Sequence, residues 1–146
     1  MERQERREQI LNILAAGIRK VLLNTVPKPE ELQEIRMRLG QPLRVVRGKE
    51  EIVLRSGTEP YIVTKEELRE TMDYISHYSL YAYENELRQG FVTVEGGHRV
   101  GVAGKVIMEK ERVKNIQYIS SLNIRVSHEV LGCADRLIPY IVANKQ

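Results

Sequence analysis

The stretch that decides the fold is residues 34–47, EIRMRLGQPLRVVR. In its first half, apolar side chains alternate with charged ones at every second position, which is typical of a β-strand with one buried face. Residues 40–42 (GQP) then turn the chain into a second run rich in Val and Arg. The sequence therefore predicts an antiparallel hairpin, with Arg36 and Arg38 side by side on its polar face.

The segment before this hairpin has helical periodicity. Apolar residues recur at helical spacing, and they are Ile10, Leu14, Ile18, Val21 and Leu22. This pattern predicts one long amphipathic helix from about Arg3 to Asn24, which Pro27 and Pro29 end. Burial in the domain core is the expected use of the apolar stripe. Docking on a membrane partner, as a structural adaptor, is the alternative.

The segment after the hairpin alternates between strand and helix signals. Thr64 and Glu67 form a capping box that begins a helix, and Gly90 is placed to end another. In chain order we expect strands at 52–54 and 61–63, helices from 65 and at 80–89, strands at 91–94, 99–108, 113–119 and 122–126, and a helix at 133–143. The predicted class is α+β: an antiparallel sheet covered by helices, with a long N-terminal helix and a C-terminal helix.

Composition sets broad limits on the class of protein. The chain has 146 residues, of which 42% are hydrophobic and 29% charged, and its net charge is +3. These values are typical of one globular domain and unlike those of a disordered chain. Cys133 is the single cysteine, so no internal disulfide can form, which fits a reducing cytoplasm. We expect neither an export signal nor a membrane span.

Residues 95–105, EGGHRVGVAGK, are glycine-rich and basic but do not form a phosphate loop. A phosphate loop needs a glycine where this chain has Arg99, and a Ser or Thr where it has Val106. No serine lies in a nucleophile elbow, and the histidines and Cys133 lack the paired spacing of zinc ligands. We therefore expect no catalytic residue, no metal and no cofactor in this chain.

Two further patterns have competing interpretations. Tyrosines cluster in one segment, Tyr74, Tyr78, Tyr81 and Tyr83, and could stack on single-stranded nucleic acid. The acidic residues beside them favour half-buried packing instead. The strand arginines suit bidentate contact with phosphate or carboxylate, and the competing interpretation is a solvated surface. A nucleic-acid-binding module remains an alternative function.

Several ordered blocks together resemble the stage III sporulation protein AA family. They are residues 34–43, 78–88, 96–104, 119–126 and 132–135. Members of that family continue into an ATPase domain that contains a phosphate loop, which this chain lacks. The resemblance implies that residues 1–131 are an N-terminal α+β domain and that residues 132–146 are a helix leading toward the ATPase domain. Catalysis, with ATP and Mg²⁺, would belong to the longer protein.

A weaker resemblance points to the N-terminal domains of type II and type IV secretion ATPases. Those domains are PAS-like, pack on the neighbouring subunit in a hexameric ring and present arginines toward nucleotide. This implies a role for Arg99 and Arg125, and less directly for Arg36 and Arg38.

The implied partners are the chain's own ATPase domain, neighbouring subunits and membrane proteins of the channel between mother cell and forespore, with no nucleic acid. The implied location is cytoplasmic, on the mother-cell side, peripheral to the membrane.

Overall fold

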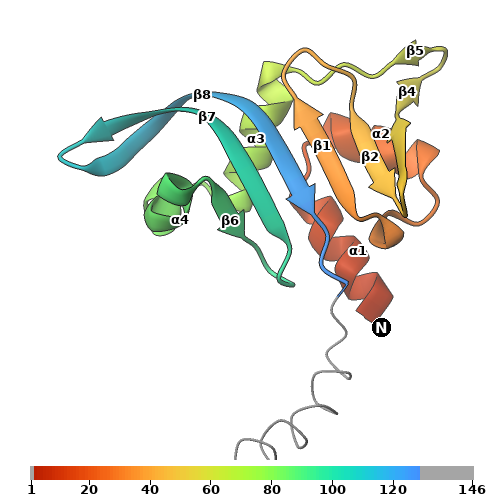
Figure 1. Ribbon diagram of the computed structural model, residues 1–146, viewed down its shortest axis with the longest axis horizontal. Helices are drawn as coiled ribbons and strands as arrows, with labels where there is room; N and C mark the ends of the chain where they lie inside the picture. The colour runs from red at the N-terminus through yellow and green to blue at the C-terminus, as the bar shows by residue number, and fades with distance from the viewer. Residues whose placement is uncertain (1, 129–146) are drawn as a thin grey trace, which may run out of the picture.

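The computed structural model describes residues 2–128. It confirms the predicted α+β class: an antiparallel sheet of six strands is packed against helices (Figure 1). The helical elements are α1 (Glu2–Asn12), α2 (Ala16–Thr25), η1 (Pro29–Glu31), α3 (Lys65–Ile75), η2 (Leu80–Tyr83) and α4 (Glu84–Gln89). The strands are β1 (Glu34–Arg38), β2 (Arg44–Arg47), β3 (Glu50–Val53), β4 (Arg55–Ser56), β5 (Glu59–Pro60), β6 (Phe91–Thr93), β7 (Arg99–Glu109) and β8 (Arg112–Arg125).

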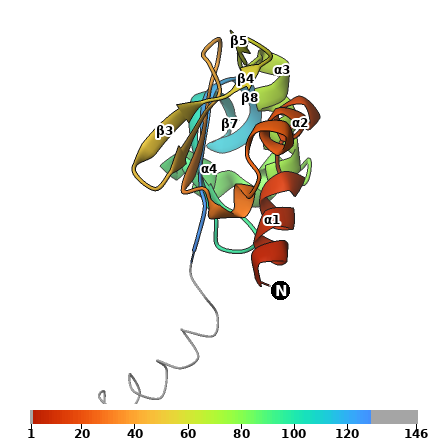
Figure 2. The same cartoon turned by 90° about the vertical axis from the view of Figure 1, so that its right-hand side faces the viewer.

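The large sheet has the strand order β3-β2-β1-β8-β7-β6, with every pairing antiparallel. The predicted hairpin of residues 34–47 supplies β1 and β2, and the last described strand, β8, pairs with β1 at the centre. Helices α1, α2 and α3 all lie on the same side of this sheet (Figure 2). The sheet thus has a helix-covered inner face and an opposite outer face.

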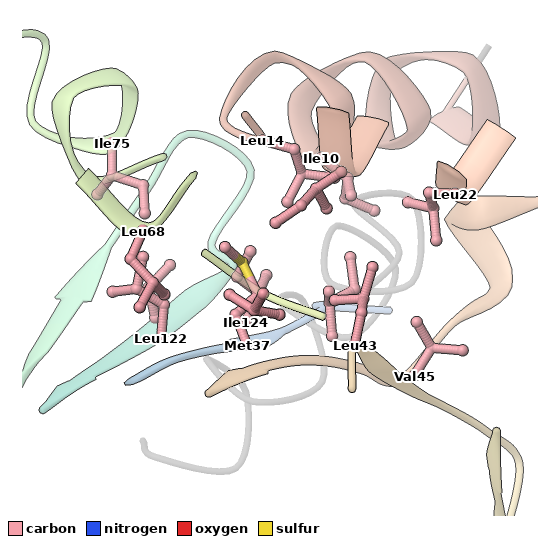
Figure 3. Packing of buried hydrophobic residues seen from close by; sticks show 14 of the residues in the cluster. Ile10, Leu14, Leu22, Met37, Leu43, Val45, Leu68, Ile75, Leu122 and Ile124 are labelled. Atoms are coloured by element: carbon pink, nitrogen blue, oxygen red, sulfur yellow. The ribbon is translucent and has the colours of Figure 1, made fainter. Parts of the chain in front are cut away.

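The core fills the space between the inner face and the helices. Figure 3 shows Ile10 and Leu14 of the N-terminal segment above Met37 and Ile124 of the two central strands. All five stripe residues are buried: Ile10, Leu14, Ile18 and Leu22 fully, and Val21 with 9% of its surface exposed. The stripe is therefore used for core burial, as expected, and is not available for docking a membrane partner.

The expectation of one long N-terminal helix is wrong, because α1 and α2 are separate helices. The backbone of Ala15 is extended, with φ −54° and ψ 146°. Its N–H donates to Thr71 Oγ1 at 3.0 Å, and the N–H of Ala16 donates to Glu70 Oε2 at 2.7 Å. Arg19 donates in turn to the carbonyl of Leu11, in the last turn of α1, and to that of Leu14, in the break itself. Side chains of α3 and α2 thus cap the break and supply the hydrogen bonds that a continuous helix would have made.

Three smaller expectations also differ from the structure. Residues 61–63 are not a strand; a two-stranded ribbon, β4 with β5, precedes them, and Ile62 makes only a single bridge to Pro42. Residues 80–89 form a 3₁₀ turn followed by α4, because η2 packs on β8 whereas α4 packs on β6. The two strands expected at 113–126 are one strand, β8, because bulges along the β7–β8 hairpin absorb the irregularity.

Several local predictions are confirmed. Thr64 and Glu67 form the capping box of α3 with both reciprocal hydrogen bonds. Gly90 ends α4 in the left-handed conformation, with φ 87°. The charged turn between β7 and β8 places Lys110 and Glu111 in the left-handed region that a tight hairpin requires. The helix expected at residues 133–143, and with it the segment 132–146, lies outside the described residues.

Candidate functional site

The outer face of the sheet carries all four arginines that the sequence singles out. We call it the arginine face and define it by residues of five neighbouring strands: Glu34, Arg36 and Arg38 of β1, Arg44 of β2, Glu51 of β3, Ser121, Asn123 and Arg125 of β8, and Arg99 of β7. The arginine face contains five arginines and two glutamates, so its net charge is +3. Strand alternation explains why the charged residues share one face, because the residues between them point to the other face, into the core.

Two arginines are directly opposite each other on β1 and β2. Arg36 and Arg44 are cross-strand partners, an arrangement that is unfavourable for like charges. The carboxylate of Glu51 resolves it: one oxygen lies 2.6 Å from Arg36 Nη1 and the other 3.1 Å from Arg44 Nε. Glu34 adds a second contact, 2.8 Å from Arg36 Nε, and this hydrogen bond is the main cause that raises the pKa of Arg36. This half of the face is neutralised internally.

A second pair of arginines is directly opposite on β7 and β8. Arg99 and Arg125 are also cross-strand partners. Their surroundings provide much less negative charge: Arg125 Nε is 3.6 Å from Glu34 Oε1, and the Arg125 side chain is 70% exposed. The guanidinium of Arg99 lies 4.4 Å from the centre of the Phe91 ring and has no ion pair within the described residues. This pair is much less compensated than Arg36 and Arg44.

Two adjoining hollows lie on the arginine face along β1, and Arg99 lines neither of them. One is lined by Arg38, Asn123 and Arg125 among others, and the adjoining one by Arg36, Arg38 and Arg44 among others. Arg38 is exposed and makes no ion pair in the described part of the chain. The side-chain oxygen of Asn123 is buried without a hydrogen-bond partner there. The face therefore offers free donors and one free acceptor at its centre.

The structure brings all four predicted arginines onto one face, and their role in binding nucleotide stays a prediction. Sequence reasoning missed Arg44, Glu51 and Glu34 as members of the same cluster. Their alternation along β1 to β3 was visible, but the register that places Glu51 between two arginines was not. Asn123 was noted only as lying on the same side of its strand as Arg125.

The other candidates lie elsewhere. The expectation of half-buried tyrosines holds for Tyr74 and Tyr83 but is wrong for Tyr78 and Tyr81, which are 74% and 60% exposed. After α3 the backbone of Tyr78 is left-handed, and its ring meets Tyr74 only edge-on. Among residues 2–128, no group of three or more potential metal ligands comes together. In the same range, none of the helices combines the length and hydropathy that a membrane crossing needs.

Fold and face together define an α+β domain with an arginine-rich sheet face that α1, α2 and α3 leave uncovered (Figure 2). The chain belongs to the stage III sporulation protein AA family, since the family model "Sporulation stage III, protein AA" matches residues 4–146. It is 36% identical over 138 residues to stage III sporulation protein AA of Bacillus subtilis (strain 168), an alignment that covers 93% of this chain and 43% of that relative. The chain thus spans less than half the length of this relative. No solved structure matches it.

Proposed function

We propose that this chain is the regulatory and assembly domain of a sporulation-specific ATPase of the secretion type. In this proposal it performs no catalysis itself. Its arginine face packs against an ATPase domain of the same or a neighbouring subunit and directs arginines toward bound nucleotide. The full-length protein would bind ATP and Mg²⁺, form a hexameric ring and energise the channel between mother cell and forespore from the mother-cell cytoplasm, beside the channel's membrane proteins.

One observation supports this proposal most directly: the outer sheet face has an excess of positive charge that the described residues do not neutralise. Cross-strand arginines without a full counterion destabilise a domain slightly, so their presence favours use in an interface. Arginine is suited to this use because its planar guanidinium binds phosphate or carboxylate oxygens in pairs and keeps its charge.

The same face gives less support to the nucleic-acid alternative. Single-stranded nucleic acid is bound where basic and aromatic side chains alternate along one surface. Here α3, which carries Tyr74, is on the helix-covered side of the sheet, away from the arginines (Figure 2). The aromatic ring next to the arginine face, Phe91, is itself covered by Arg99.

The test is ATP turnover and assembly of the full-length protein. We expect Arg99→Ala and Arg125→Ala each to lower turnover by about a thousandfold or more, the scale of an arginine acting on phosphoryl-transfer charge, while the fold is kept. Arg47→Ala is the matched control, because Arg47 is exposed at the end of β2 and belongs to the other side of the strand alternation. Wild-type turnover and wild-type assembly in both face variants would refute the proposed role.

A further inference from the structure

We propose that Arg99 and Arg125 form an oxyanion site and that Glu34 is its resident anion, which an incoming ligand displaces from Arg125. The ligand class is a phosphate group or a carboxylate. This inference rests on the proposed function, because it names the ligand chemistry and the regulation of the same face.

The first support is an internal comparison between two equivalent pairs. Arg36–Arg44 and Arg99–Arg125 are both cross-strand arginine pairs on one face of one sheet. In the first pair a single carboxylate, Glu51, places one oxygen on each guanidinium, at 2.6 and 3.1 Å. The first pair thus shows which ligand such an arrangement accepts, namely an anion with two oxygens that bridges neighbouring strands. The second pair has no bridging carboxylate among the described residues.

The second support is the position of Glu34 between the two pairs. Glu34 is the cross-strand partner of Arg125 on β1, so its carboxylate is placed beside that arginine by register. One of its oxygens lies 2.8 Å from Arg36, whereas the other is 3.6 Å from Arg125. The Glu34 side chain is only 19% exposed, while that of Arg125 is 70% exposed. Glu34 is therefore held by Arg36 and only loosely engaged by Arg125.

Because Glu34 is close to Arg36 and only loosely engaged by Arg125, an incoming ligand can replace it at Arg125. An arriving oxyanion can take Arg125 away from Glu34, while Glu34 keeps its short contact with Arg36 and is not left without a partner. The Arg99 guanidinium stacks over the Phe91 ring of β6 and has no ion pair among the described residues, so an arriving oxyanion meets no competing carboxylate there. Loss of an exposed ion pair costs little, so Glu34 lowers the affinity of the site moderately and excludes weak anions without blocking it.

The experiment uses the 146-residue chain and follows the Nε–H signals of its arginines by NMR during titration with inorganic phosphate. A parallel titration with sodium chloride at equal ionic strength removes general screening. We expect phosphate to shift the Arg99 and Arg125 signals and to leave those of Arg36 and Arg44 in place. Glu34→Gln should tighten phosphate binding about two- to fivefold, the range set by an exposed ion pair.

Glu51→Gln is the matched control, because it removes a carboxylate of the same face from the other pair. It should leave phosphate affinity at Arg99 and Arg125 unchanged and should add a phosphate response at Arg36 and Arg44. Unchanged affinity in Glu34→Gln, or a wild-type response centred on Arg36 and Arg44, would overturn the proposal. A titration with sodium acetate distinguishes the two ligand classes. A response equal to that of phosphate identifies a carboxylate ligand, and a response to phosphate alone identifies a phosphate group.

The outcomes are independent of the test of the proposed function. Phosphate binding that depends on Glu34, together with normal ATP turnover of the Arg99 and Arg125 variants, would remove the ATPase role and keep the oxyanion site. Reduced turnover of these variants, without any response of the chain to phosphate or acetate, would keep the ATPase role and remove the oxyanion site.

Discussion

His98 joins the N-terminal helix to the segment that follows β8, and replacing it should destabilise the domain markedly. Its side chain is 1% exposed. Nδ1 accepts a hydrogen bond from the N–H of Ser127 at 2.9 Å, and Nε2 lies 2.9 Å from Gln9 Oε1. A backbone N–H can only donate, so Nδ1 has no proton, and Nε2–H donates to Gln9. The buried ring therefore has to be neutral.

The magnitude follows from what His98→Ala removes. Two hydrogen bonds contribute about 0.5–1.5 kcal/mol each, and the lost ring leaves a cavity and unsatisfied groups. We expect the free energy of unfolding to fall by about 2–4 kcal/mol at pH 7.5. With a urea m-value of about 2 kcal/mol/M, the middle of the usual range, the unfolding midpoint should move down by roughly 1–2 M. His77→Asn is the control, since it removes an exposed imidazole and keeps a residue that tolerates the left-handed backbone.

The effect should also depend on pH. Burial lowers the pKa of His98, and the charges of Arg6 and His128 lower it further. The unfolded chain, with a histidine pKa of about 6.5, then binds a proton before the folded chain does. Stability from neutral His98 is therefore complete above about pH 6.5 and is lost as the pH falls from there toward the lowered folded-state pKa. The difference between wild type and His98→Ala should be smaller at pH 5 than at pH 7.5. A loss below about 1 kcal/mol, or one that is the same at both pH values, would refute this reasoning.

Two further predictions concern the backbone. Thr64→Ala removes the capping box of α3 and should lower the free energy of unfolding by about 0.5–2 kcal/mol in urea, whereas Thr58→Ala, in an exposed turn, should have almost no effect; equal losses in both would contradict the capping argument. Gly104→Ala would place its Cβ 2.3 Å from the carbonyl oxygen of Tyr118, so we expect a loss of about 1–3 kcal/mol in thermal unfolding. Gly101→Ala, whose nearest contact would be 3.9 Å away, should be tolerated, and similar losses for the two glycines would contradict the steric explanation.

The sequence predicted those elements whose signals are local. Period-two alternation in residues 34–38 gave β1 and its inner and outer sides, and the Thr64–Glu67 pair gave the start of α3. It could not predict the break between α1 and α2. The apolar stripe continues through that point, and the groups that cap it, Thr71 and Glu70, are more than fifty residues away along the chain.

For the site, residue types and strand alternation by themselves determined that arginines gather on one side of their strands. Pairing was decided only in the tertiary structure. Register placed Glu51 between Arg36 and Arg44. It left Arg99 and Arg125 opposite each other, with Glu34 in loose contact with Arg125 alone of these two. The physical reason is that a charge is neutralised through distances of a few ångströms between strands, and those distances depend on strand order and register, which alternation along one strand does not contain.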